Sequence, residues 1–116
     1  MAAAVVAARW YANRADELGR RRDFPLVSVV LLAVLAHEAM HMAGLVQEHA
    51  AECAAVQRDA RAARLLGASP DDARALAVAY WRTAYPAMPD GYRSTACRPG
   101  GTLDEHLPDA PWAPGS

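Results

Sequence analysis

The segment from His37 to His41 combines residue types that can bind a metal ion and activate water. Its sequence, His37-Glu38-Ala39-Met40-His41, fits the pattern His-Glu-x-x-His. On a helix, side chains four positions apart differ in direction by about 40°, so both imidazoles project from one face. Neutral imidazole nitrogens bind Zn²⁺ at about 2.0–2.1 Å, and the metal lowers the pKa of a bound water towards about 7. The segment therefore predicts a helical zinc site of the metallopeptidase type, with Glu38 as the general base that takes the proton.

A zinc ion held by two histidines needs a third protein ligand and one open position. Gly44 lets the chain turn back after the motif, and Glu48 and Glu52 stand four apart on the helix expected next. We expect Glu48 to be the third ligand, because it begins the returning helix. We expect Glu52 to accept the other N–H of a ligand imidazole. Glu52, His49 and His106 remain alternatives as third ligand, and without the histidine pair the two glutamates would be an ordinary acidic helix stripe.

A longer pattern extends over two stretches of the chain. These are VLAHEAMHMAGLVQEHAAECAAVQRDARAARLLG from Val34 to Gly67 and YRSTACRPGGTLDEHLPDAPW from Tyr92 to Trp112. Together they resemble the short zincin-like proteins of actinobacteria, whose metallopeptidase activity is inferred from the same motif. The resemblance implies metal binding by His37, His41 and Glu48, a base at Glu38, and a paired structural role for Cys53 and Cys97. This chain lacks the longer N-terminal portion of those proteins and offers no clear edge strand, the element to which zinc peptidases add an extended substrate.

The two cysteines of the chain, Cys53 and Cys97, permit one intramolecular disulfide. The resemblance favours this disulfide, which would stabilise the fold by about 4 kcal/mol in the chain-entropy model. Two free thiols in a reducing cytosol are the alternative, and the lack of an evident signal peptide favours them. The expected location is therefore cytoplasmic from the missing signal, or extracytoplasmic if the N-terminus is truncated and the disulfide forms.

A hydrolytic zinc site also needs a hydrogen-bond donor for the anionic intermediate. Tyr92 and Arg93 are the best candidates, because the tail that carries them can fold over the metal. The competing interpretation is a turn tyrosine and a surface arginine.

The composition favours a mainly α fold, since much of the 53% hydrophobic content is alanine, the best helix former. We expect one domain over residues 1–116 with an N-terminal helix within 1–25, metal-site helices over 26–86 and a Pro- and Gly-rich tail over 87–116. The expected helices cover about 2–22, 26–43, 46–66 and 70–86. Glycines at 44 and 67 end the second and third, and Ser69 caps the fourth.

The stretch 26–36 is apolar on nearly all sides, which favours a buried, central helix, although its β-branched first half would also suit a strand. It is too short to cross a bilayer, which requires about 20 apolar residues. The net charge of −1 gives no field that would attract nucleic acid. A peptide or protein is the expected partner, and the oligomeric state is open.

The sequence thus predicts a zinc-dependent hydrolase, most simply a metallopeptidase. A non-catalytic helical protein that zinc stabilises and that acts through a partner is the alternative. A third hypothesis has no metal and treats the histidine pair as a coincidence.

Overall fold

A computed structural model of the chain describes residues 26–113, which form four α-helices and three short turns of other helix types. The α-helices are α2 (Leu26–Met42), α3 (Glu48–Val56), α4 (Asp59–Leu65) and α5 (Pro70–Ala79). A π-helical turn η1 (Tyr80–Ala84) and two 3-10 turns, η2 (Tyr85–Ala87) and η3 (Asp90–Tyr92), follow. No β-strand occurs between residues 26 and 113, so the mainly α fold class is confirmed. The helix expected within 1–25 lies outside the described residues.

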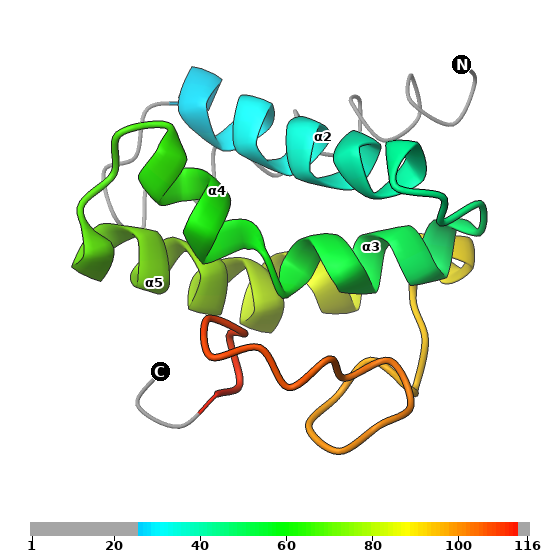
Figure 1. Ribbon diagram of the computed structural model, residues 1–116. Helices are drawn as coiled ribbons and strands as arrows, with labels where there is room; N and C mark the ends of the chain where they lie inside the picture. The colour runs from blue at the N-terminus through cyan, green and yellow to red at the C-terminus, as the bar shows by residue number, and fades with distance from the viewer. Residues whose placement is uncertain (1–25, 114–116) are drawn as a thin grey trace.

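Helix α3 lies between α2 and the C-terminal tail (Figure 1). Helix α2 packs against α3 and α4, α4 packs against α5, and η3 packs against α3. Every residue of α3 from Ala51 to Val56 is buried, whereas Leu35 of α2 is 52% exposed. The central position expected for the motif helix is therefore not confirmed.

The helix ends follow the local signals. Gly44, two residues after the end of α2, has a φ of 108°, and Gly67, two residues after the end of α4, has a φ of 106°. Both values lie in the left-handed region in which helices often end at glycine. The hydroxyl of Ser69 accepts the N–H of Asp72 at 3.1 Å, with Pro70 in the first helical position. The expected boundaries at these residues are confirmed.

The prediction of a single helix over 46–66 is wrong, because the helix is interrupted at Gln57 and Arg58, between α3 and α4. The guanidinium of Arg58 donates to the carbonyl of Ala54 at 3.0 Å, and the backbone N–H of Arg58 bonds to Ala55 instead. Similarly, the side-chain amide of Gln57 donates to the carbonyl of Cys53 at 3.1 Å. The guanidinium of Arg58 thus takes the Ala54 carbonyl that its own backbone N–H would use in a continuing helix, and a new helix starts at Asp59. The carbonyl of Cys53 accepts both the side-chain amide of Gln57 and its backbone N–H, the latter at 3.3 Å.

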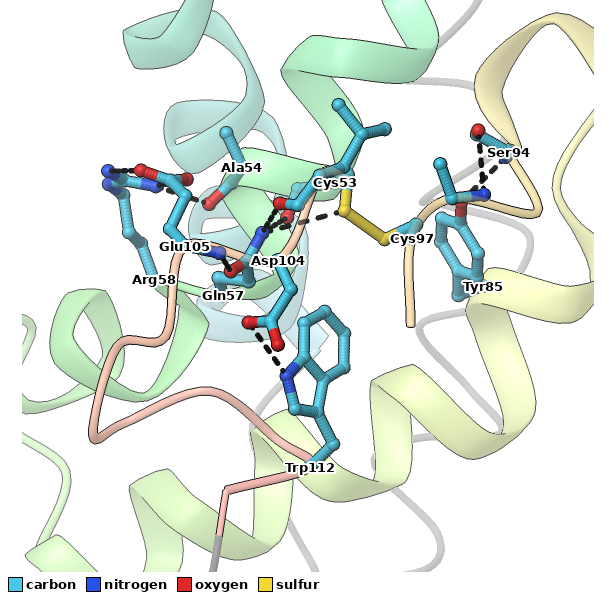
Figure 2. Close-up of a disulfide and its surroundings, with 12 residues drawn as sticks. Cys53, Ala54, Gln57, Arg58, Tyr85, Ser94, Cys97, Asp104, Glu105 and Trp112 are labelled. Carbon is cyan, nitrogen blue, oxygen red and sulfur yellow. Dashed lines mark hydrogen bonds and ion pairs between the residues drawn. A yellow bond between two sulfur atoms is a disulfide. The ribbon is translucent and has the colours of Figure 1, made fainter. Parts of the chain in front are cut away.

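The tail is ordered coil that is fastened to α3 (Figure 2). Cys53 and Cys97 form a disulfide, with Cα atoms 5.7 Å apart, so the pairing is confirmed. Gln57 is fully buried; it donates to the carbonyl of Leu103 at 2.9 Å and accepts the N–H of Glu105 at 2.8 Å. Among the described helices, none has the length and apolar character needed to cross a membrane.

Candidate metal centre

The C-terminal end of α2 and the start of α3 bring together three atoms that can bind a metal ion. Nε2 of His37 and Nε2 of His41 lie 3.1 Å apart, as expected for side chains one turn apart on a helix. The turn at Gly44 returns the chain, and Oε1 of Glu48 comes within 3.1 Å of the first nitrogen and 2.5 Å of the second. The three atoms form a compact triangle.

The hydrogen bonds of the two Nδ1 atoms determine which nitrogen of each imidazole ring carries the proton. Nδ1 of His41 donates to the carbonyl oxygen of Leu45 at 2.7 Å, an atom that can only accept. Nδ1 of His37 donates to Oε1 of Glu52 at 3.0 Å. Both neutral imidazoles therefore turn an Nε2 lone pair towards the carboxylate oxygen of Glu48. Three lone pairs that point at one place repel each other unless a cation or a proton lies among them.

The neighbouring charged groups shift the pKa values of His37 and Glu48. Burial lowers the pKa of His37, but the hydrogen bonds and negative charges of Glu52 and Glu48 outweigh burial, and its pKa is raised above the ordinary value. Burial raises the pKa of Glu48, but the hydrogen bond from Tyr92 and the close contacts with the rings of His37 and His41 outweigh burial, and its pKa is lowered. Both shifts favour a positive charge beside a carboxylate here.

Glu52 is enclosed and holds two groups at once. It is 0% exposed and sits one turn below Glu48 on α3. While Oε1 accepts Nδ1–H of His37, Oε2 accepts the hydroxyl of Tyr80 at 2.6 Å. A carboxylate that holds the far nitrogen of a metal-binding imidazole sets its tautomer and its orientation. This is the position expected for Glu52.

Tyr92 reaches the centre from η3. Its hydroxyl donates to Oε2 of Glu48 at 2.9 Å, and its ring centroid lies 5.6 Å from that of His37. Burial and the charge of Glu48 raise its pKa, so the hydroxyl stays protonated and acts as a donor. The tail thus places Tyr92 beside Glu48, while the neighbouring Arg93 forms an ion pair with Asp90.

Glu38 belongs to the same group of metal-binding side chains. One ligand atom from each of His37, Glu38 and His41 lies within 4.8 Å of the others, so these three residues can hold a metal ion. That spacing is looser than the contacts of Glu48, whose Oε1 lies within 3.1 Å of both Nε2 atoms. We therefore take Glu48 to complete the tight triangle and Glu38 to border it. His106, a sequence alternative for the third ligand, is largely exposed and pairs with Asp104 instead.

The sequence pattern assigns no role at this centre to Tyr80. It is 4% exposed, and its hydroxyl bonds to Glu52. The one available signal was general: the hydroxyl of a buried tyrosine usually has a hydrogen-bond partner. Spacing along the chain did not identify that partner, because the two residues are 28 positions apart.

Comparisons with known proteins add no relative to this picture. No family model matches the chain, and neither the curated proteins nor the solved structures contain a match. The inference of function therefore depends on the centre itself.

Proposed function

We propose that the protein is a zinc-dependent hydrolase of the metallopeptidase type, with the metal held by His37, His41 and Glu48. The observation that carries the proposal is the convergence of two Nε2 lone pairs and one carboxylate oxygen on a single point. Ligand atoms of a tetrahedral zinc ion with bonds of about 2.0–2.1 Å are about 3.3–3.4 Å apart. The two separations of 3.1 Å are close to that value, and the separation of 2.5 Å needs a small outward movement of Glu48.

Zinc is the metal that this set of donors favours. Two imidazoles and one carboxylate with a fourth position open is the ligand set of catalytic zinc sites, whereas magnesium and calcium prefer oxygen ligands alone. Zinc bound in this way supplies an electrophile that polarises a carbonyl group and acidifies a water molecule. The resemblance to zincin-like proteins points to the same metal.

The residues around the metal divide the remaining tasks. Glu38 borders the ligand triangle and acts as general base towards the attacking water. Glu52 holds His37 by its far nitrogen, which leaves Nε2 free to bind. Tyr92 is the candidate donor for the anionic intermediate; to serve, its hydroxyl turns from Glu48 to the substrate oxygen.

The test combines metal content with turnover. Wild-type protein and Glu38→Gln are both expected to hold one equivalent of zinc after dialysis, and His37→Ala is expected to hold none. Against a mixed peptide library, Glu38→Gln should lose at least about 100-fold in turnover, the usual contribution of a general base. A wild type without stoichiometric zinc would refute the proposal.

The alternative function, a zinc-stabilised protein that acts through a partner, has one observation in its favour. Residues 26–113 provide no strand edge for an extended peptide substrate. Equal and near-zero turnover in wild type and Glu38→Gln, with zinc retained in both, would support this alternative over catalysis.

The disulfide supports a location outside the reducing cytosol. This is the extracytoplasmic alternative of the sequence analysis. The two cysteines that form the disulfide are buried, at 1% exposure for Cys53 and 3% for Cys97.

A further inference from the structure

We propose that Tyr80 is a positioning residue that sets the affinity of the centre for its metal by acting through Glu52 on His37. The inference rests on the metal site proposed above and adds a residue from the opposite half of the chain. Tyr80 does not touch the ligand atoms. It lies at the end of a chain of hydrogen bonds that leads to one of them.

The chain of hydrogen bonds is short and enclosed. The hydroxyl of Tyr80 donates to Oε2 of Glu52 at 2.6 Å, and Oε1 of Glu52 accepts Nδ1–H of His37 at 3.0 Å. The exposed fractions of the three residues are 4%, 0% and 1%. Hydrogen bonds to a carboxylate are about twice as strong as neutral ones, and water has little access to replace one that is lost.

The hydroxyl of Tyr80 fixes the direction of the carboxylate. The terminal torsion of a glutamate is broad, so one hydrogen bond to His37 leaves the plane of the Glu52 carboxylate weakly defined. A second bond from Tyr80 to the other oxygen holds that plane, and Oε1 then points at Nδ1 of His37. The imidazole is kept in the tautomer and orientation that present Nε2 to the metal.

The backbone that carries Tyr80 is a second observation in favour of a role at the site. Helix α5 ends at Ala79, and Tyr80 begins the π-helical turn η1, in which the N–H of Tyr85 bonds to the carbonyl of Tyr80. Such turns insert one residue into a helix and are found frequently at functional sites. Here the insertion lies where the hydroxyl of Tyr80 contacts Glu52.

The experiment compares two tyrosine-to-phenylalanine variants that are matched in burial. Tyr80→Phe removes the hydroxyl that bonds to Glu52. Tyr85→Phe removes the hydroxyl of a tyrosine with a similar exposure of 6%, and this hydroxyl accepts the N–H of Ser94 at 2.9 Å (Figure 2). Zn²⁺ affinity is measured by competition with a chromophoric chelator, and the folding of each metal-free variant is checked by circular dichroism. We expect the Kd of Tyr80→Phe to rise about 10- to 100-fold and that of Tyr85→Phe to change less than about twofold.

A double-mutant cycle tests the route through Glu52. If Tyr80 acts through this carboxylate, Tyr80→Phe in a Glu52→Gln background should weaken zinc binding much less than it does in the wild type. The full effect in that background would overturn the proposed route. In the wild type, the hydroxyl proton of Tyr80 should exchange slowly in NMR spectra and shift when Zn²⁺ binds. This measurement tests the proposal even if a variant fails to fold, and an unchanged resonance would overturn it.

The outcomes separate this inference from the proposed function. Wild-type protein that binds zinc, together with equal affinities in Tyr80→Phe and Tyr85→Phe, overturns the role of Tyr80 and leaves the metal site in place. Equal losses in the two variants overturn it as well, since they indicate general loosening. A wild type that binds no zinc overturns both proposals.

Discussion

Glu48 and Glu52 are one turn apart on α3, and their positions relative to α2 give them different contacts. Glu48, at the start of α3, is level with the Nε2 atoms of the histidine pair. Glu52, one turn further on, reaches Nδ1 of His37 in the interior. One helical turn therefore separates Glu48, a candidate metal ligand, from Glu52, which orients the candidate ligand His37.

Each of these carboxylates also accepts a tyrosine hydroxyl from the C-terminal half of the chain, and the one on Glu48 belongs to Tyr92. With zinc saturating, we expect Tyr92→Phe to lower kcat about 100-fold with little change in KM, because one donor to an anionic intermediate contributes about 10²–10³ in rate. Steady-state kinetics at several zinc concentrations provide the measurement. Full recovery of activity in excess zinc would mean that the hydroxyl serves only to hold Glu48.

Asp59 is a buried carboxyl outside the metal centre, at 3% exposure. Burial and the nearby charge of Glu52 raise the pKa of Asp59 well above its ordinary value. A raised pKa in the folded state means that wild-type stability falls as pH rises from about 4, the ordinary pKa, towards the raised one. Asp59→Asn removes this loss and should increase the free energy of unfolding at pH 7 by about 1 kcal/mol or more, since one pKa unit corresponds to about 1.4 kcal/mol.

Urea unfolding of wild type and Asp59→Asn from pH 4 to pH 8, in metal-free buffer, measures the difference directly. The difference should be near zero at the acid end and grow with pH. The matched control is Asp109→Asn at the partly exposed ion pair with Arg64, where a change within about 1 kcal/mol is expected. A pH-independent difference for Asp59→Asn would contradict the assignment.

The sequence was most informative where one helix carries the whole pattern. The spacing of His37 and His41 was sufficient to place both imidazoles on one face, and that prediction is confirmed by their 3.1 Å separation. The contribution of Tyr80 was not predictable, because it depends on how α5 and η1 pack beside α3. Local periodicity carries no information on contacts between residues so far apart in the chain.

At the scale of the elements, the break between α3 and α4 shows a similar limit. No glycine or proline lies at Gln57 and Arg58, so the usual signals for a helix end are missing. The break coincides with side-chain bonds to helix carbonyls and with contacts from Gln57 and Arg58 to the tail. Tertiary structure therefore ends α3, whereas α2 and α4 end at glycines that the sequence displays.

Gln57 is the polar connection between these elements and the tail. Gln57→Met keeps the length of the side chain but leaves the carbonyl of Leu103 and the N–H of Glu105 without this partner. Because each buried polar group left unpaired costs about 1–3 kcal/mol, we expect the free energy of unfolding to fall by about 2–4 kcal/mol. Denaturant unfolding provides the measurement.

Arg58 provides the matched control for that variant. It also contacts the tail, through an ion pair with Glu105, but both side chains are about a third exposed or more. Arg58→Met should therefore cost no more than about 1 kcal/mol. If the two variants were equally destabilised, the buried amide would not be the main polar attachment of the tail.

At the scale of the whole molecule, the centre is assembled from both halves of the described chain. Helices α2 and α3 supply the candidate ligands, whereas η1 and η3 supply the tyrosines that hold the two carboxylates. The sequence predicted a coil tail that folds over a metal site, and the tail reaches the candidate centre through the bond of Tyr92 to Glu48. The physical link that keeps it there is the disulfide, five residues beyond Tyr92 in the chain.

Removal of that link should affect stability and metal binding together. Cys53→Ala combined with Cys97→Ala opens a loop with a sequence separation of 44 residues, which in the chain-entropy model costs about 4 kcal/mol. If the tail then holds Glu48 less firmly through Tyr92, zinc affinity should fall as well, by about tenfold.

Because a ligand stabilises the folded state by RT ln(1 + [L]/Kd), a tenfold weaker affinity reduces the stabilisation by excess zinc by about 1.4 kcal/mol. Urea unfolding of both proteins, with excess Zn²⁺ and with a chelator, measures the two effects separately. An equal gain from zinc in both proteins would show that the disulfide stabilises the fold without supporting the metal centre.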